Sequence, residues 1–123
     1  MINKSKIDYG FLYLNNFKIL KRAFQNFKSK KMSIDFIKFC ENNSSWLDDY
    51  SLFMAIKEKQ NGASWDYWEE ESKNRINLEN ISRQLKENIE FYCFIQWQFF
   101  DQWERFINYA HSNNISIIGD MPI

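Results

Sequence analysis

The sequence predicts an α/β chain that is mostly α-helical, with one short β-strand near its C-terminus. Its 123 residues include only three glycines and one proline, so few positions can interrupt a helix. Apolar residues recur at intervals of three and four over most of the chain, which is the spacing of one helix face. Residues 115–118 (ISII) are the exception, because their β-branched side chains favour a strand buried on both faces.

The first helix is expected over about residues 11–28. Its apolar face is formed by Phe17, Leu20, Phe24 and Phe27. A second helix should follow Ser33, which fits an N-cap and has Asp35 in the first turn after it.

A third helix is expected over about residues 46–59. Ser45 fits its N-cap, because a hydroxyl oxygen can accept a hydrogen bond from a free backbone N–H group. Asn61 and Gly62 should end the helix, because both residue types tolerate the left-handed conformation of a helix C-terminus.

The last predicted helix is long, from an N-cap at Asn77 to about Ser112. Between Phe91 and Trp103 nearly every position is apolar or aromatic. A helix that is apolar on most sides must be buried on most sides. So small a chain can hardly bury it alone, and we expect further protein to cover it.

Asn113 and Asn114 should break this helix, and residues 115–118 should then form the strand. A parallel strand needs neighbours to satisfy its backbone hydrogen bonds, and the sequence offers no second strand. We therefore interpret the chain as part of a larger α/β protein.

Composition excludes several classes of partner and site. Sixteen basic and 16 acidic residues balance, so the basic excess typical of nucleic-acid binders is missing. No apolar run is long enough to span a bilayer, and no signal peptide is evident at the N-terminus, so we expect a cytoplasmic protein without a membrane partner. Cys40 and Cys93 fit neither a metal spacing nor a disulfide framework and are interpreted as reduced, buried thiols. The single histidine, His111, fits a helix C-terminus better than a metal site, so no metal and no cofactor are expected.

Asp120 is the carboxylate best placed for function. It follows the predicted strand directly, and functional side chains gather at the carboxyl ends of strands in α/β folds. A turn aspartate between Gly119 and Pro122 is the equally good alternative. Aromatic residues make up 19% of the chain, which core packing explains best, although some rings could stack on sugars.

Four segments carry distinctive patterns in a fixed order. Residues 7–13 read IDYGFLY, residues 46–58 read WLDDYSLFMAIKE, residues 94–103 read FIQWQFFDQW, and residues 115–123 read ISIIGDMPI. They are similar to VDYGxxY, WLDDYALFMALKE, FxQWxFFxQW and GIxIIGDMPI of the amylomaltase or 4-α-glucanotransferase family of the α-amylase clan. Together they resemble that family over nearly the whole chain. Ser51 stands where the family has Ala, and Asn114 stands where it usually has Gly.

The resemblance implies a fragment of a (β/α)8 TIM-barrel enzyme. Residues 1–112 would be its helical insertion, and residues 113–123 one barrel strand with the start of the following loop. The family transfers α-1,4-glucan segments between maltooligosaccharides by a retaining mechanism. Its nucleophile and acid/base match no residue of this chain, so the fragment alone is expected to be inactive.

The resemblance also assigns roles to individual residues. Asp120 matches the family's strand-end Asp, which supports the active-site end of the barrel without being the nucleophile. Tyr13 matches a Tyr implicated in glucan contact away from the cleavage point. Tyr50 and Trp97 match family aromatics whose roles in substrate binding and packing stay open. The implied partners are α-1,4-glucans and the rest of the barrel. The alternative function is a non-catalytic helical module that binds glucan or another protein.

Overall fold

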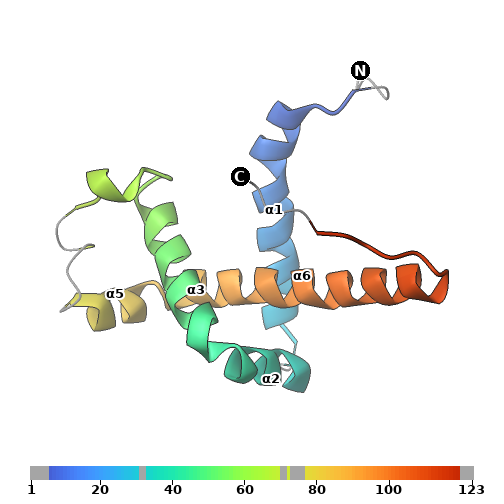
Figure 1. Cartoon of the computed structure of the whole chain (residues 1–123). Coiled ribbons are helices and arrows are strands. Elements are labelled where there is room, and N and C mark those ends of the chain that lie inside the picture. Colours follow the sequence, from blue (N-terminus) through green and yellow to red (C-terminus); the bar gives the residue numbers. More distant parts are fainter. Residues whose placement is uncertain (1–5, 31–32, 70–71, 73–76, 120–123) are drawn as a thin grey trace.

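The computed structural model describes residues 6–30, 33–69, 72 and 77–119 (Figure 1). The elements in this part of the chain are α1 (Tyr9–Lys28), α2 (Ile34–Asn42), α3 (Ser44–Lys59), the 3₁₀ turn η1 (Trp65–Tyr67), α5 (Leu78–Gln84) and α6 (Lys86–Ser112).

Helix α6 is the axis of the structure. It contacts α1, α2, α3 and α5. Figure 1 shows α1 and α3 crossing it, α2 lying along one side, and α5 leading into its N-terminus. Because the other α-helices contact one another less, α6 supplies most of the surface on which the described chain packs.

Aromatic rings form the core between α6 and its neighbours. The Phe24 ring of α1 lies 5.5 Å, centroid to centroid, from the rings of both Phe91 and Phe94 on α6. On α2, Phe36 meets Trp97 of α6 at 5.6 Å. Tilted and edge-on pairs at these distances add to the gain from burying apolar area.

The crossing of α3 and α6 depends on small side chains. Leu47, Ser51 and Ala55 of α3 have no exposed surface and follow one another at intervals of four residues. Ser51 meets its polar requirement locally, because its hydroxyl donates to the backbone oxygen of Asp48 at 3.2 Å. The same hydroxyl interacts with the Cys93 thiol of α6, so the fully buried Ser51 lies directly against that helix.

A polar network joins α1, α3 and α6 beside this core. Lys21 of α1 donates to Glu58 of α3, and Asn88 of α6 donates to the other oxygen of Glu58 at 3.1 Å. Burial alone would raise the pKa of Glu58, but these two hydrogen bonds and the Lys21 charge hold it below its usual value. Burial, together with the Glu58 charge, raises the pKa of Tyr92 to about 12.

Two predicted helix ends are confirmed, and both have the same geometry. At the end of α3, Asn61 has φ of 54° and the Gly62 N–H donates to the Lys57 oxygen at 2.8 Å. At the end of α6, Asn114 has φ of 58° and the Ile115 N–H donates to the Ala110 oxygen at 3.0 Å. These are Schellman motifs, in which a left-handed residue lets the chain satisfy the last helical carbonyls.

The predicted start of α3 was wrong. Asn43, not Ser45, is the N-cap, and Ser45 lies inside the helix. The side chain of Asn43 also explains why α2 and α3 meet there. Its amide donates to the Phe39 oxygen at 2.8 Å, and its carbonyl accepts from the Trp46 indole at 3.1 Å.

The long helix predicted from Asn77 to Ser112 is two helices. Leu85 separates α5 from α6, with φ of −99° and ψ of 15°. The hydrogen bonds continue past this point, because the Leu85 N–H donates to Ile81 and the Ile89 N–H donates to Leu85. Leu85 packs both against the main core and against a smaller cluster of Ile56, Trp68 and Ile81. Leu85 therefore contacts both clusters at the point where α5 ends and α6 begins.

The predicted β-strand is not formed in the described residues. Residues 115–118 have no regular secondary structure, and in Figure 1 they turn back from the end of α6 toward α1. A strand is stabilised by hydrogen bonds to a neighbouring strand, and no other segment in the described ranges is a strand that could pair with it. Over these ranges the chain is therefore helical, and the α/β expectation is not met within them.

Replacing Ser51 should test the α3–α6 crossing. We expect Ser51→Leu to lower the free energy of unfolding by roughly 1–3 kcal/mol, because added methylenes overpack a site without free volume. Ser51→Ala should cost much less, since it keeps the volume small. Urea unfolding followed by circular dichroism measures both. Ser45→Leu, on the exposed side of α3, is the matched control. Equal stability of the two Leu variants would contradict the packing described.

Stability should also fall in acid because of Glu58. Its pKa is lowered in the folded state, so its contribution is present above the unfolded carboxyl pKa of about 4.3 and is lost as the pH falls below it. Thermal melts at neutral pH and near pH 3.5 should therefore differ more for the natural sequence than for Glu58→Gln. Glu79→Gln, on the exposed face of α5, is the control. An unchanged pH dependence in Glu58→Gln would show that the lowered pKa of Glu58 does not contribute to the pH dependence of stability.

Candidate functional site

Asp120, the predicted strand-end carboxylate, lies outside the described residues. Its supporting role in catalysis therefore stays a prediction. The same holds for the start of the loop after the barrel strand, because residues 120–123 also lie outside the described residues.

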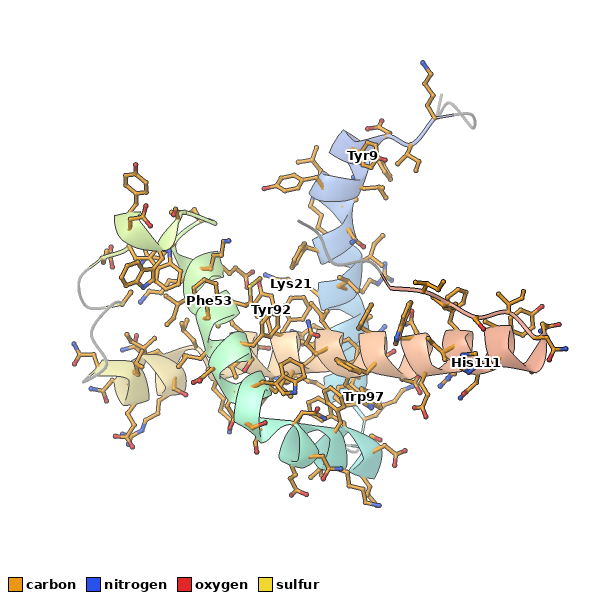
Figure 2. The ribbon with its side chains drawn as sticks, viewed as in Figure 1. Tyr9, Lys21, Phe53, Tyr92, Trp97 and His111 are labelled. Atoms are coloured by element: carbon orange, nitrogen blue, oxygen red, sulfur yellow. The ribbon has the colours of Figure 1, made fainter. Side chains whose placement is uncertain are left out.

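Tyr13 lies on the N-terminal half of α1, and 84% of its surface is exposed. Neighbours on the same half, including Tyr9 and Leu14, are also exposed. In Figure 2 this end of α1 extends away from α6. Tyr13 is thus accessible to a ligand or to another part of a protein.

Tyr50 is half-buried between α3 and α6. Its hydroxyl accepts a hydrogen bond from the Gln96 side chain at 3.0 Å, and its ring lies 6.1 Å from the Trp46 ring. The hydroxyl is held by a residue of the FIQWQFFDQW segment, so two segments that resemble the family meet at this bond.

Trp97 is part of the aromatic packing. Its ring lies 5.5 Å from Phe27, 5.6 Å from Phe36 and 6.2 Å from Phe94, centroid to centroid. Figure 2 shows it where α2 meets α6. The ring is only partly buried, so one edge remains open.

Tyr50 of α3 contacts α6, the helix that carries Trp97. Tyr13 lies apart from both. Tyr13 precedes Phe24, the α1 residue in the core, by about three helical turns, or roughly 16 Å of helix. The three predicted binding residues therefore do not form one site within the described chain.

The cysteines are free thiols with raised pKa values. Burial, with a smaller effect of the neighbouring Cys93, raises the pKa of Cys40 to about 12. Burial also raises the pKa of Cys93. A thiol that stays protonated is a poor nucleophile and a poor metal ligand. Residues 6–30, 33–69, 72 and 77–119 contain no group of three or more His, Cys, Asp and Glu side chains that could hold a metal ion.

The second half of α6 carries an exposed strip of aromatic residues that sequence reasoning expected to be covered. The α6 aromatic strip consists of Phe99, Trp103, Phe106 and Tyr109, with exposed fractions of 55%, 43%, 53% and 70%. Phe99 and Trp103 are nearly parallel, with 9° between their planes. Their spacing of three and four residues already predicts one face, but not which protein segment covers it. None of the described helices is long and apolar enough to cross a membrane.

Comparison with known proteins gives one consistent family. The model of a protein family described as "4-alpha-glucanotransferase" matches residues 2–123. A 4-alpha-glucanotransferase from Clostridium butyricum is 45% identical over 123 residues, which are 98% of this chain and 25% of that protein. One from Aquifex aeolicus is 40% identical over 94% of this chain and 23% of its own length. One from Solanum tuberosum, named chloroplastic/amyloplastic, is 37% identical over 86% of this chain and 19% of its own length.

The chain thus spans between about a fifth and a quarter of the length of these curated relatives. The match to the family covers its motifs at residues 7–13, 46–58, 94–103 and 115–123, in the order that the sequence presents them. On this match, the chain belongs to the 4-alpha-glucanotransferase family.

Proposed function

We propose that this chain is one part of a 4-alpha-glucanotransferase that moves α-1,4-glucan segments between maltooligosaccharides by a retaining mechanism. The observation that carries the proposal is the family match over residues 2–123, with 45% identity to the Clostridium butyricum protein. A cytoplasmic location is part of the same proposal.

The proposed chemistry needs a pair of carboxyl groups. A retaining enzyme uses two carboxyl groups about 5 Å apart, one as nucleophile and one as acid/base. Three carboxylates of the described residues have partners within the chain. Glu58 binds Lys21 and Asn88, Glu87 binds Lys28, and Asp101 binds Arg105. The resemblance matches the family's nucleophile and acid/base to no residue of this chain, and the proposal therefore places both in the part of the enzyme beyond this quarter.

Within that enzyme the chain has a supporting role. Asp120 would orient groups at the active-site end of a (β/α)8 barrel, where functional side chains follow the strands. Tyr13, exposed on α1, would contact glucan away from the cleavage point. Tyr50 and Trp97 would hold the helices in place, since each has its contacts inside the described chain.

The exposed apolar surface supports a partner of large area. The α6 aromatic strip, the N-terminal half of α1 and Ile118, which is 92% exposed, present many apolar side chains to solvent. Large exposed apolar patches usually mark interfaces. We assign the remainder of the barrel as the partner that covers them, because the relatives are about four times as long as this chain.

A non-catalytic module remains the second candidate. The 84% exposure of Tyr13 and the parallel Phe99 and Trp103 rings favour it, because exposed aromatic faces bind glucan or protein without a catalytic group.

A chimera tests the proposed function directly. This chain would replace the matching quarter of the Clostridium butyricum enzyme, and disproportionation of maltotriose would be followed by glucose release. We expect the chimera to be active and the 123-residue chain alone to be inactive. In the chimera, Asp120→Asn should lower kcat on the order of 10²-fold, because a misplaced active-site group loses rate steeply. Asp49→Asn, an exposed change on α3, should leave it unchanged.

An inactive chimera that is nevertheless folded would count against the proposal. Activity of the isolated chain would overturn the assignment of the nucleophile elsewhere. Full activity of Asp120→Asn would reduce that residue to a structural one.

A further inference from the structure

A cavity of about 580 Å³ lies between α2 and α6, on a surface that the proposed function does not use. The α2–α6 groove is lined by residues of both helices, among them Phe39 and Asn42 of α2 and Phe100 and Asp101 of α6. Its volume lies within the usual range for small-molecule sites, roughly 300–1,000 Å³. Trp97, one of the aromatics that resemble family positions, also borders it.

The aromatic residues that line the groove pack against other rings. The Phe39 and Phe100 rings lie 5.6 Å apart, and Trp46 holds Phe100 from another side at 5.9 Å. Phe36 and Phe27 hold Trp97 in the same way. Phe100 still has 42% of its surface exposed, so part of its ring is free to meet a ligand.

The polar residues of the lining carry both donors and acceptors. Asp35 and Asn42 line it from α2, and Gln98 lines it from α6. Arg105 forms an ion pair with Asp101 at 2.7 Å within this lining. Amides and carboxylates beside an aromatic base can bind hydroxyl groups while the ring meets an apolar C–H face.

The charge of the groove argues against an anionic ligand. Its lining has three carboxylates, from Asp35, Asp101 and Glu104, and two cations, from Lys38 and Arg105. The balance is one negative charge, whereas phosphate or nucleotide sites gather cations or helix N-termini. A neutral ligand rich in hydroxyl groups fits this lining better.

We propose that the α2–α6 groove binds a segment of α-1,4-linked glucose as an additional site of the enzyme. The choice of glucan over other polyols rests on the proposed function, whereas the neutral, hydroxyl-rich class rests on the lining alone. Such a site would hold long glucan chains near the enzyme and would matter little for short substrates that do not extend to it.

Binding by the 123-residue chain is the first test. Maltoheptaose is titrated into the isotope-labelled chain, and amide chemical shifts are followed by NMR. Shifts should concentrate in residues 35–42 and 97–105. Phe100→Ala should weaken the apparent Kd about tenfold or more, as expected for an aromatic anchor. Phe53→Ala, with the same exposed fraction of 42% on α3 and no place in the groove, should leave it unchanged. Asn42→Ala tests the polar part of the lining without removing an aromatic ring.

The chimera gives a second readout that does not depend on the isolated chain. There, Phe100→Ala should lower kcat/KM for amylose severalfold and leave kcat/KM for maltotriose unchanged. Equal loss with both substrates would assign Phe100 to folding or to the active site and overturn the proposal. Shifts outside the groove, equal effects of Phe53→Ala, or equal binding of cellohexaose would overturn it as well. An active chimera without this amylose effect would reject the groove and keep the proposed function.

Discussion

The packing of the first half of α6 against α1, α2 and α3 is the constraint on which the rest of the structure depends. Phe91, Tyr92, Cys93 and Phe94 are four consecutive buried residues, so this turn of α6 is covered on every side. A helix can be covered in this way only if several others cross it. Ser51 and Ala55 allow α3 to approach closely, and the aromatic rings of α1 and α2 fill the remaining space. The proposed groove depends on the same packing, because Phe39 and Trp97 of its lining pack against the core.

The second half of α6 shows the opposite situation. The α6 aromatic strip has the composition of a core but the exposure of a surface. The same contrast occurs along α1, where Phe24 is buried and Tyr13 is exposed. One end of each helix therefore belongs to the packed centre, and the other end is an apolar surface without a cover in the described chain. This division agrees with a chain that matches only about a quarter of the length of its relatives.

Local features of the fold could be predicted from the sequence, and distant ones could not. The ends of α3 and α6 were correct because Asn61, Gly62 and Asn114 adopt their left-handed conformations for reasons that lie within a few residues. The N-cap of α3 was wrong because the side chain of Asn43 bonds to Phe39 and Trp46, a choice that propensity does not reveal. The strand at residues 115–118 has the right composition, yet a strand forms only with a partner. At the candidate site, exposure of Tyr13 and the bond from Gln96 to Tyr50 required the fold, and Asp120 stays a prediction from the resemblance.

Hydrogen exchange of backbone amides along α6 tests the central claim most directly, namely that the buried first half of this helix organises the structure. Mass spectrometry or NMR of the 123-residue chain would resolve exchange residue by residue. Amides of residues 89–97 should be the most protected of the chain, and most of those of residues 103–112 should exchange much faster, since Ala110 is the one buried side chain among residues 103–112. Uniform protection along α6, or stronger protection of its second half, would contradict the account.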